Sequence, residues 1–379
     1  MLKKIQLSYF FRYLGDALFY PFMSLYLINR SIEGEKLGII LGVLPLIAIV
    51  ANLLFSFVKI NHKYERLVLY IMLLFEGVMI FLYGFNLTFL LYFILTIFVG
   101  LTNTPYYSLL DSYTTRNIVS SNEYPRIRIM GSIAYIFGGA FGGILIDKIG
   151  YFYLFLIAFI TYIISFIFFL FVKERNDIFV LNDENKNNYK ICFNSCFLIY
   201  ILFYVLILGS NNIFDTYFNV YLEQLGFNVV NIGIINSFIV VSETIMMLVM
   251  IKVLQNKINL KSFLLFCALT LVIKNFVFYF NLPNYILIAF SLLRGVGWGG
   301  ILAVNVVVME KLVGKSNLTF ALLFNAIVVG VFRSVMNYIV GSIYIDIGFN
   351  IIFLSIAITQ IVGVIILLFS KKMKVKLND

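Results

Sequence analysis

Eight ionisable residues lie deep inside long apolar runs of this 379-residue chain. They are four cations and four carboxylates: Arg12, Asp16, Glu76, Asp215, Glu243, Lys274, Arg294 and Arg333. Each would cost about 2.5 to 3.5 kcal/mol near the centre of a membrane-spanning helix. We therefore expect the set to face an aqueous cavity or one another. Together they could bind a polar solute and exchange protons, whereas single members could simply form ion pairs that hold helices together.

Proton coupling requires a group whose protonation changes as the protein changes conformation. Burial favours the neutral form of a carboxyl group, and a nearby cation favours its ionised form. A carboxyl group inside the apolar runs can therefore respond to movements of its surroundings. Glu243, Asp215 and Glu76 are the candidates for carrying the proton.

Two of the cations are candidates for structural ion pairs. Arg12 and Asp16 are four residues apart, which places them on one helix face and suits a local pair. We expect Arg333 to pair with Asp215 or Glu243 on another helix. Asp16 remains a candidate for binding substrate as well.

The composition excludes a water-soluble fold. Hydrophobic residues make up 62% of the chain, only 12% is charged, and the mean hydropathy is +1.00. Soluble proteins average roughly 25% charged residues, so this chain cannot cover a water-facing surface. Three cysteines without metal-ligand spacing, and the single histidine His62 in a polar loop, indicate no metal and no enzyme active site. We also find no phosphate-binding loop and expect no cofactor.

Twelve apolar runs are long enough to cross a hydrocarbon core of ~30 Å. They lie at about 5–28, 37–58, 67–85, 87–110, 127–146, 150–172, 196–221, 231–251, 262–281, 285–308, 318–343 and 350–370. The first is too long for a signal peptide and carries two charged residues, so we interpret it as a retained span. The sequence predicts an all-α integral membrane protein with twelve transmembrane helices.

The loop charges set the orientation of these helices. If both termini are cytoplasmic, nearly all the loop lysines and arginines fall on the cytoplasmic side, and only Arg30, Lys36 and Lys148 fall outside. Cytoplasmic loops are enriched in Lys and Arg in this way. The net charge of +10 is therefore better explained by membrane orientation than by nucleic-acid binding. We expect a multi-pass protein of the cell membrane with both ends in the cytoplasm.

The two halves of the chain look like copies of each other. Phe85–Leu87 recurs as Phe280–Leu282, and Gly100 recurs as Gly295 at the same offset of 195 residues. The segment Gly142–Gly150 is echoed by Gly341–Gly348 near the end of the second half. A polar stretch separates the copies, so the predicted domains are a six-helix bundle at 1–172, a linker at 173–192 and a second bundle at 193–379. Parallel repeats of this kind hold their substrate between the halves near the bilayer midplane.

Four motifs resemble one branch of a known family. They are Glu123–Tyr135, Tyr20–Leu27, Ile213–Phe218 and Tyr344–Phe349. Taken in their order along the chain, they resemble the lactose-permease and phenylpropionate-permease branch of the major facilitator superfamily, which is oligosaccharide:proton symporter-like. The resemblance implies a fold of two pseudo-symmetric six-helix bundles.

The resemblance also implies roles for individual residues. Arg128 stands where the family has an arginine that contacts the sugar, and Tyr135 where an aromatic side chain stacks on it. Lys274 and Arg294 stand where the family has an arginine and a histidine. Gly297 occupies the position of the family's proton-carrying glutamate. Ser108 stands where the family has a glutamate that partners the arginine.

These observations favour a secondary active transporter that works by alternating access. It would import a small polar or anionic solute, such as a sugar, a nucleoside or an aromatic acid, by proton symport. The substrate-binding candidates are Arg128, Tyr135, Lys274, Arg294 and Asp16. The expected partners are this solute, protons and the lipid bilayer, with the protein as a monomer. The alternatives are a uniporter or an exporter of the same fold, or a membrane sensor that transports nothing.

Overall fold

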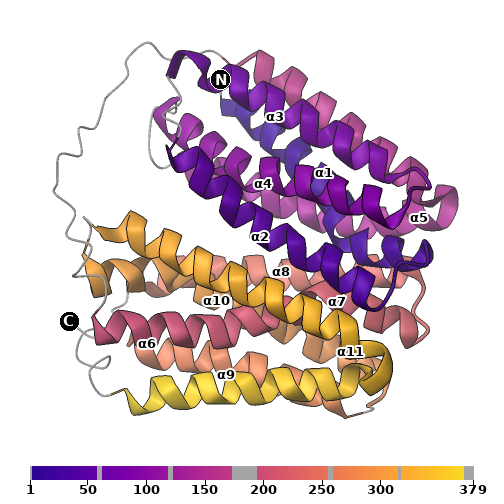
Figure 1. Ribbon diagram of the computed structural model, residues 1–379. Helices are drawn as coiled ribbons and strands as arrows, with labels where there is room; N and C mark the ends of the chain where they lie inside the picture. Colours follow the sequence, from indigo (N-terminus) through magenta and orange to yellow (C-terminus); the bar gives the residue numbers. More distant parts are fainter. Residues whose placement is uncertain are drawn as a thin grey trace. The chain divides into compact units, whose positions relative to one another are not determined.

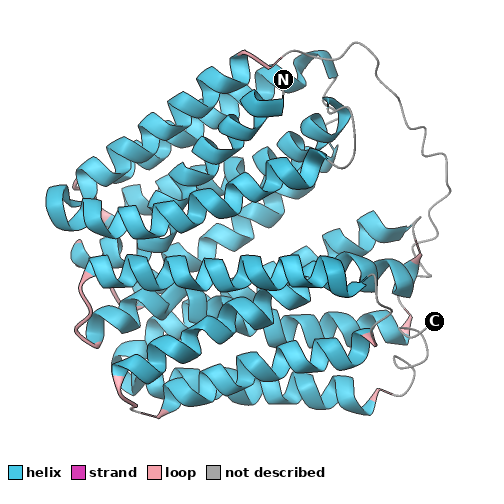
Figure 2. Cartoon of the chain, turned by 180° about the vertical axis from the view of Figure 1, so that it is seen from behind, coloured by secondary structure: helices cyan, strands magenta, loops and turns pink. Residues whose placement is uncertain are grey.

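The computed structural model describes residues 2–57, 62–117, 123–172, 194–254, 259–280, 282–314 and 317–370. Within these ranges every regular element is a helix, as Figure 2 shows. This confirms the predicted all-α class. The predicted linker at 173–192 lies outside the described residues.

The chain divides into two compact units. The first unit comprises Met1–Asn182 with Asn219–Ser237, and the second comprises Asp183–Phe218 with Phe238–Asp379. The helices that lie wholly in the first unit are α1 (Leu2–Asn29), α2 (Glu35–Phe57), α3 (His62–Tyr83), α4 (Phe89–Asn117) and α5 (Glu123–Leu170) (Figure 1). Helix α1 packs along α5, α2 packs against α4, and α3 packs against both α4 and α5.

The second unit is built around α9, which packs against α10 and α11. Its helices are α6 (Ser195–Tyr204), the π-helical turn η2 (Val205–Gly209), α9 (Leu260–Tyr279), α10 (Asn284–Val313) and α11 (Leu318–Phe369). Helices α7 (Ser210–Gln224) and α8 (Val229–Leu254) each have one part in either unit. Without a break, α6, η2 and α7 follow one another along the chain.

Some helix boundaries differ from the sequence prediction. Helix α4 continues to Asn117 and α10 to Val313, because the polar residues after the apolar core of each run extend the helix. His62, which we placed in a loop, is the first residue of α3. An apolar run therefore marks the part of a helix that can contact hydrocarbon and underestimates the length of the helix.

A single glycine interrupts each of the two longest helices. Gly150 inside α5 has φ 82°, and Gly348 inside α11 has φ 76°. These backbone angles are readily available only to glycine. In Figure 1, α11 changes from orange to yellow as it reverses direction. Both glycines end the segments that echo each other in the sequence, so the two halves break their helices at matching positions.

The described part of the chain contains nine helices that are long and apolar enough to cross a membrane. Their outer faces expose large apolar side chains, including Leu90, Ile71, Phe238 and Phe369. A soluble monomer rarely exposes so much contiguous apolar surface. The chain is therefore a multi-pass membrane protein.

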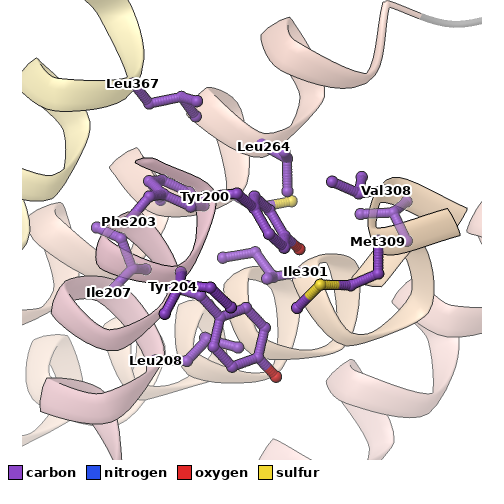
Figure 3. Close-up of a cluster of buried hydrophobic side chains, with 14 of the residues drawn as sticks. Tyr200, Phe203, Tyr204, Ile207, Leu208, Leu264, Ile301, Val308, Met309 and Leu367 are labelled. Carbon is purple, nitrogen blue, oxygen red and sulfur yellow. The ribbon is translucent and has the colours of Figure 1, made fainter. Parts of the chain in front are cut away.

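Aromatic and aliphatic side chains fill the interior of the second unit. Figure 3 shows Tyr200 and Tyr204 from α6 beside Ile301 and Met309 from α10, with Leu264 from α9 close by. Glycines on α10 bring it near α9: a Cβ on Gly297 would lie 2.7 Å from the carbonyl oxygen of Cys267. Residue 297 can therefore carry no side chain in this packing.

The contact between α1 and α5 leads to a stability prediction. A Cβ added to Gly138 would lie 2.3 Å from the Cβ of Ala17, closer than two such atoms can approach. We expect Gly138→Ala to lower the free energy of unfolding by about 1–3 kcal/mol, as overpacking does. The measurement is thermal unfolding of the purified protein in detergent.

The matched control removes the clash from the other side. Because the closest contact is with the Cβ of Ala17, the double variant A17G/G138A should recover much of the lost melting temperature. If the double variant is no more stable than G138A, then the close approach of these two helices is not what limits position 138.

Candidate functional site

Arg12 is the centre of a buried charge cluster in the first unit. Arg12 and Asp16 lie one turn apart on α1 and form an ion pair. The same guanidinium group donates to Glu76 of α3 at 2.7 Å through Nη2, and to the hydroxyl of Tyr162 of α5 at 2.6 Å through Nη1. The side chains of Arg12 and Glu76 have no solvent exposure, and that of Asp16 has 2%. We call this set, with its polar partners described next, the Arg12 cluster.

Neutral donors complete the hydrogen bonds of the two carboxylates. Tyr162 donates to Asp16 Oδ1 at 2.5 Å, and Tyr107 of α4 donates to Asp16 Oδ2. Asn103, one turn before Tyr107, donates to Glu76 Oε1 at 2.9 Å. One cation thus faces two carboxylates, and hydroxyl and amide groups stabilise the excess negative charge.

Aromatic rings surround the guanidinium group of Arg12. It lies 4.9 Å from the ring centre of Tyr106, 4.8 Å from that of Tyr107 and 4.5 Å from that of Tyr162. A cation over an aromatic face gains about 2 kcal/mol or more when water is excluded. These rings therefore help to keep a charged arginine in a dry interior.

A second cluster forms around Arg294 of α10. Its guanidinium group binds Asp215 of α7 through Nε, at 3.1 Å and 3.2 Å, and through Nη2 at 3.0 Å. Its Nη1 pairs with Glu243 of α8, and its plane lies 5.0 Å from the ring centre of Trp298. These four residues, with Asn211 and Lys274, form the Arg294 cluster.

The two clusters differ in their access to solvent. The side chains of Arg294, Asp215 and Glu243 are 16%, 25% and 19% exposed, whereas Arg12 and Glu76 are sealed. The ionic groups of the Arg294 cluster are therefore partly accessible to solvent. The Arg12 cluster has to open before anything larger than a proton can reach it.

Lys274 of α9 is the buried member of the Arg294 cluster. Its side chain has no exposure, its Nζ donates to Asn211 Oδ1 at 2.7 Å, and it lies 3.2 Å from the ring centre of Phe214. The amide of Asn211 in turn donates to Asp215 Oδ2 at 3.2 Å. Among the described residues, no carboxylate oxygen lies within 4 Å of Lys274.

Arg333 of α11 does not take the partners that we expected for it. Asp215 and Glu243 both pair with Arg294, and within the described ranges neither forms an ion pair with Arg333. The Nε atom of Arg333 is buried without a hydrogen-bond partner. Arg294 binds both carboxylates from α10, which leaves no direct contact for a cation on α11.

Arg128 and Tyr135, both on α5, approach the Arg12 cluster through another tyrosine. The guanidinium group of Arg128 lies 4.7 Å from the ring centre of Tyr13, which is 6.2 Å from the ring of Tyr135. Tyr13 also contacts Tyr107, which binds Asp16. These side chains form one aromatic patch. The hydroxyl of Ser108 bonds the backbone carbonyl of Thr104.

The family is decided by a match over nearly the whole sequence. Residues 2–355 match the model of the MFS_1 like family. The chain belongs to this family. The MFS fold and family are those of membrane transporters rather than enzymes. No curated protein matches this MFS transporter in sequence.

Solved structures agree with the family. A mutant of the nucleoside transporter NupG has a TM-score of 0.82 and 16% identity, over 97% of this chain and 98% of that one. The D-xylose-proton symporter has a TM-score of 0.74 and 13% identity, over 98% of this chain and 97% of that one. At these identities the likeness establishes the fold of the transporter. The family match over residues 2–355 confirms the resemblance to the major facilitator superfamily.

Several members of the clusters were missed by the sequence analysis. Tyr107, Tyr162 and Asn103 are uncharged, and nothing in an apolar run marks a tyrosine as a hydrogen-bond donor. Asn211 could have been found, because at the offset of 195 residues it matches Asp16. Trp298 matches Asn103 at the same offset. The duplication therefore points to uncharged members of the Arg294 cluster.

The Arg12 cluster leads to a second stability prediction. Replacing Arg12 by glutamine leaves two buried carboxylates without their cation, which should cost about 3–5 kcal/mol. Glu76→Gln should be milder, because Arg12 keeps Asp16 as its partner. Thermal unfolding in detergent measures both, with Arg126→Gln at an exposed position as the control. Equal losses for R12Q and R126Q would show that the buried ion pairs contribute nothing to stability.

Proposed function

We propose that the protein imports a small polar or anionic solute together with protons by alternating access. Its family and fold make it a secondary transporter. The observation that supports import of such a solute is that Arg294 is partly exposed and is held between Asp215 and Glu243. Such a cation can exchange one protein carboxylate for an oxygen of the solute while it stays paired with the other carboxylate.

Arginine suits this role because its planar fork of donors binds a carboxylate or a pair of hydroxyl groups through two bonds. Trp298 stacks near the same guanidinium group and offers an aromatic face to a ring of the solute. Lys274 is the second cation of this unit, and it reaches the site through Asn211 and Asp215. Sugars, nucleosides and aromatic acids each present the oxygens or rings that these groups accept.

The first unit offers a comparable set of groups. Arg128 provides hydrogen-bond donors, and Tyr135 with Tyr13 provides stacking faces. Asp16 accepts hydrogen bonds and lies behind Tyr107. We propose that Arg128, Tyr135 and Asp16 contact the solute from this unit, with Arg12 holding Asp16 in position.

The carboxyl groups of the two clusters are the candidates for proton coupling in this proposal. Glu243, Asp215 and Glu76 are each held by an arginine, so any movement that separates the pair changes how readily the carboxyl group takes a proton. A uniporter or an exporter would use the same solute-binding groups. Coupling to an inward proton gradient distinguishes symport from both.

The membrane arrangement forms part of the same proposal. Nine membrane-length helices, two of them divided by glycine, together with α1 support twelve spans. We propose two six-helix bundles at 1–172 and 193–379 joined by a linker at 173–192, with both termini cytoplasmic. The protein would act as a monomer in the cell membrane.

Trp298 allows the substrate to be sought directly, because it is the single tryptophan of the chain. Titrating the purified protein with uridine, D-xylose and benzoate should change its fluorescence for the solute class that binds. Arg294→Gln should weaken that binding by roughly tenfold or more, the loss of a charge-assisted hydrogen bond. If R294Q binds as tightly as wild type while R126Q, the exposed control, also does, then Arg294 does not contact the solute.

Uptake into proteoliposomes tests the coupling. With an inward proton gradient we expect the solute identified above to accumulate, and we expect a protonophore to abolish the accumulation while exchange of solute continues. The independent control is the same experiment with a sodium gradient in place of the proton gradient. Accumulation that survives collapse of the proton gradient would contradict proton symport.

A further inference from the structure

The chain lacks the carboxylate that its family resemblance places on α10, and the packing explains why. A Cβ at Gly297 would lie 2.7 Å from the carbonyl oxygen of Cys267 and 2.5 Å from Leu271 Cγ, both on α9. A glutamate therefore cannot be accommodated where α10 meets α9. If a group of this helix pair exchanges protons, it has to lie elsewhere.

Lys274 is an ionisable group on the same helix pair. It lies three residues after Leu271 and four after Thr270, so it shares the face of α9 that packs near Gly297. Its side chain is fully buried, and among the described residues its hydrogen bond is to the neutral amide of Asn211. The ring of Phe214 covers another side of Nζ at 3.2 Å.

A charged ammonium group in this position is poorly compensated. Burying an ion without a counter-ion is costly enough that such groups tend to give up their charge instead. An ammonium group has three donors, and one amide oxygen satisfies one of them. The surroundings of Nζ therefore suit the neutral amine. Water or an approaching carboxylate would instead favour the ammonium form.

Asn211 connects Lys274 to the carboxylate of Asp215. The amide oxygen of Asn211 accepts from Lys274 at 2.7 Å, and its amide nitrogen donates to Asp215 at 3.2 Å. The other charged group that acts on Lys274 is Arg294 on α10, which also pairs with Glu243 on α8. Arg333 on α11 acts on Asp215. A positive charge on Lys274 attracts Asp215 and so competes with Arg294 for it.

We propose that Lys274 is the proton-carrying group of the second unit, and that its charge releases Arg294 from Asp215 to bind the solute. The amine lone pair of Nζ takes one proton from a hydronium ion, so an N–H bond forms as an O–H bond breaks. On the other side of the membrane the ammonium group returns a proton to water and becomes the neutral amine again. Proton and solute then favour each other's binding, as symport requires. The inference rests on the proposed transport function and assigns its coupling to a lysine instead of a carboxylate.

Trp298 provides a test that needs no substrate. It lies 5.0 Å from Arg294, so its fluorescence reports on the Arg294 cluster. Titrating the purified full-length protein in detergent from acid to alkaline pH should reveal a transition in wild type. The transition should disappear in Lys274→Gln and persist in Glu243→Gln and in Lys148→Gln, an exposed control.

A transition that persists in K274Q and disappears in E243Q would overturn the proposal and assign the proton to the carboxylate. Absence of any transition in wild type would also overturn it. Lys274→Met provides a second variant of similar length without a charge or a hydrogen bond. If K274Q and K274M both fail to fold, Lys274 is a structural cation and the proposal is wrong.

Binding measurements distinguish this proposal from the transport function itself. For the solute found by Trp298 fluorescence, lowering the pH should strengthen binding to wild type by about tenfold, within the range typical of linked sites. The affinity of K274Q should be independent of pH.

In proteoliposomes K274Q should exchange solute but not accumulate it. Accumulation by K274Q that equals wild type contradicts the role of Lys274, whereas a wild type that transports nothing contradicts the proposed function.

Discussion

Every charge inside this bundle has to be stabilised by protein groups, because lipid provides none. Arg12 shows how this is done: two carboxylates, a hydroxyl group and three aromatic rings surround one guanidinium group, and among the described residues only its Nε lacks a hydrogen bond. Removing any partner leaves another buried group unsatisfied, so helices α1, α3, α4 and α5 are tied together through one side chain. The packing of the first unit depends on this requirement.

The same requirement is met less completely in the second unit. Arg294 also binds two carboxylates, yet its cluster is part-exposed, and Lys274 beside it has only an amide and a ring. A cluster whose charges are closely paired and sealed from solvent stabilises one structure, whereas a part-exposed cluster with competing partners can rearrange at low cost. The charge cluster of the first unit thus holds its helices together, whereas the charge cluster of the second unit can change its ionic partners.

The sequence predicted what depends on hydropathy and charge. The apolar runs predicted an all-helical membrane protein, the ordered motifs predicted the superfamily, and the cost of burial singled out residues such as Glu76 and Asp215. The pairing of these residues depends on how the helices rotate against one another, so Arg294 was not recognised as the partner of both Asp215 and Glu243. Tyr162 and Tyr107 were missed because a tyrosine is equally common in lipid-facing and polar surroundings.

Gly150 and Gly348 have a consequence for how the protein can be handled. Each breaks its helix at one residue with a positive φ, so little extra chain lies between the two helical rods. A protease needs several residues of extended backbone to bind, and an inserted epitope needs free ends on both sides. These two turns should resist cleavage and reject insertions, although they lie between helices where a topology map would place a loop. Labels and tags are better placed where the chain has longer connections.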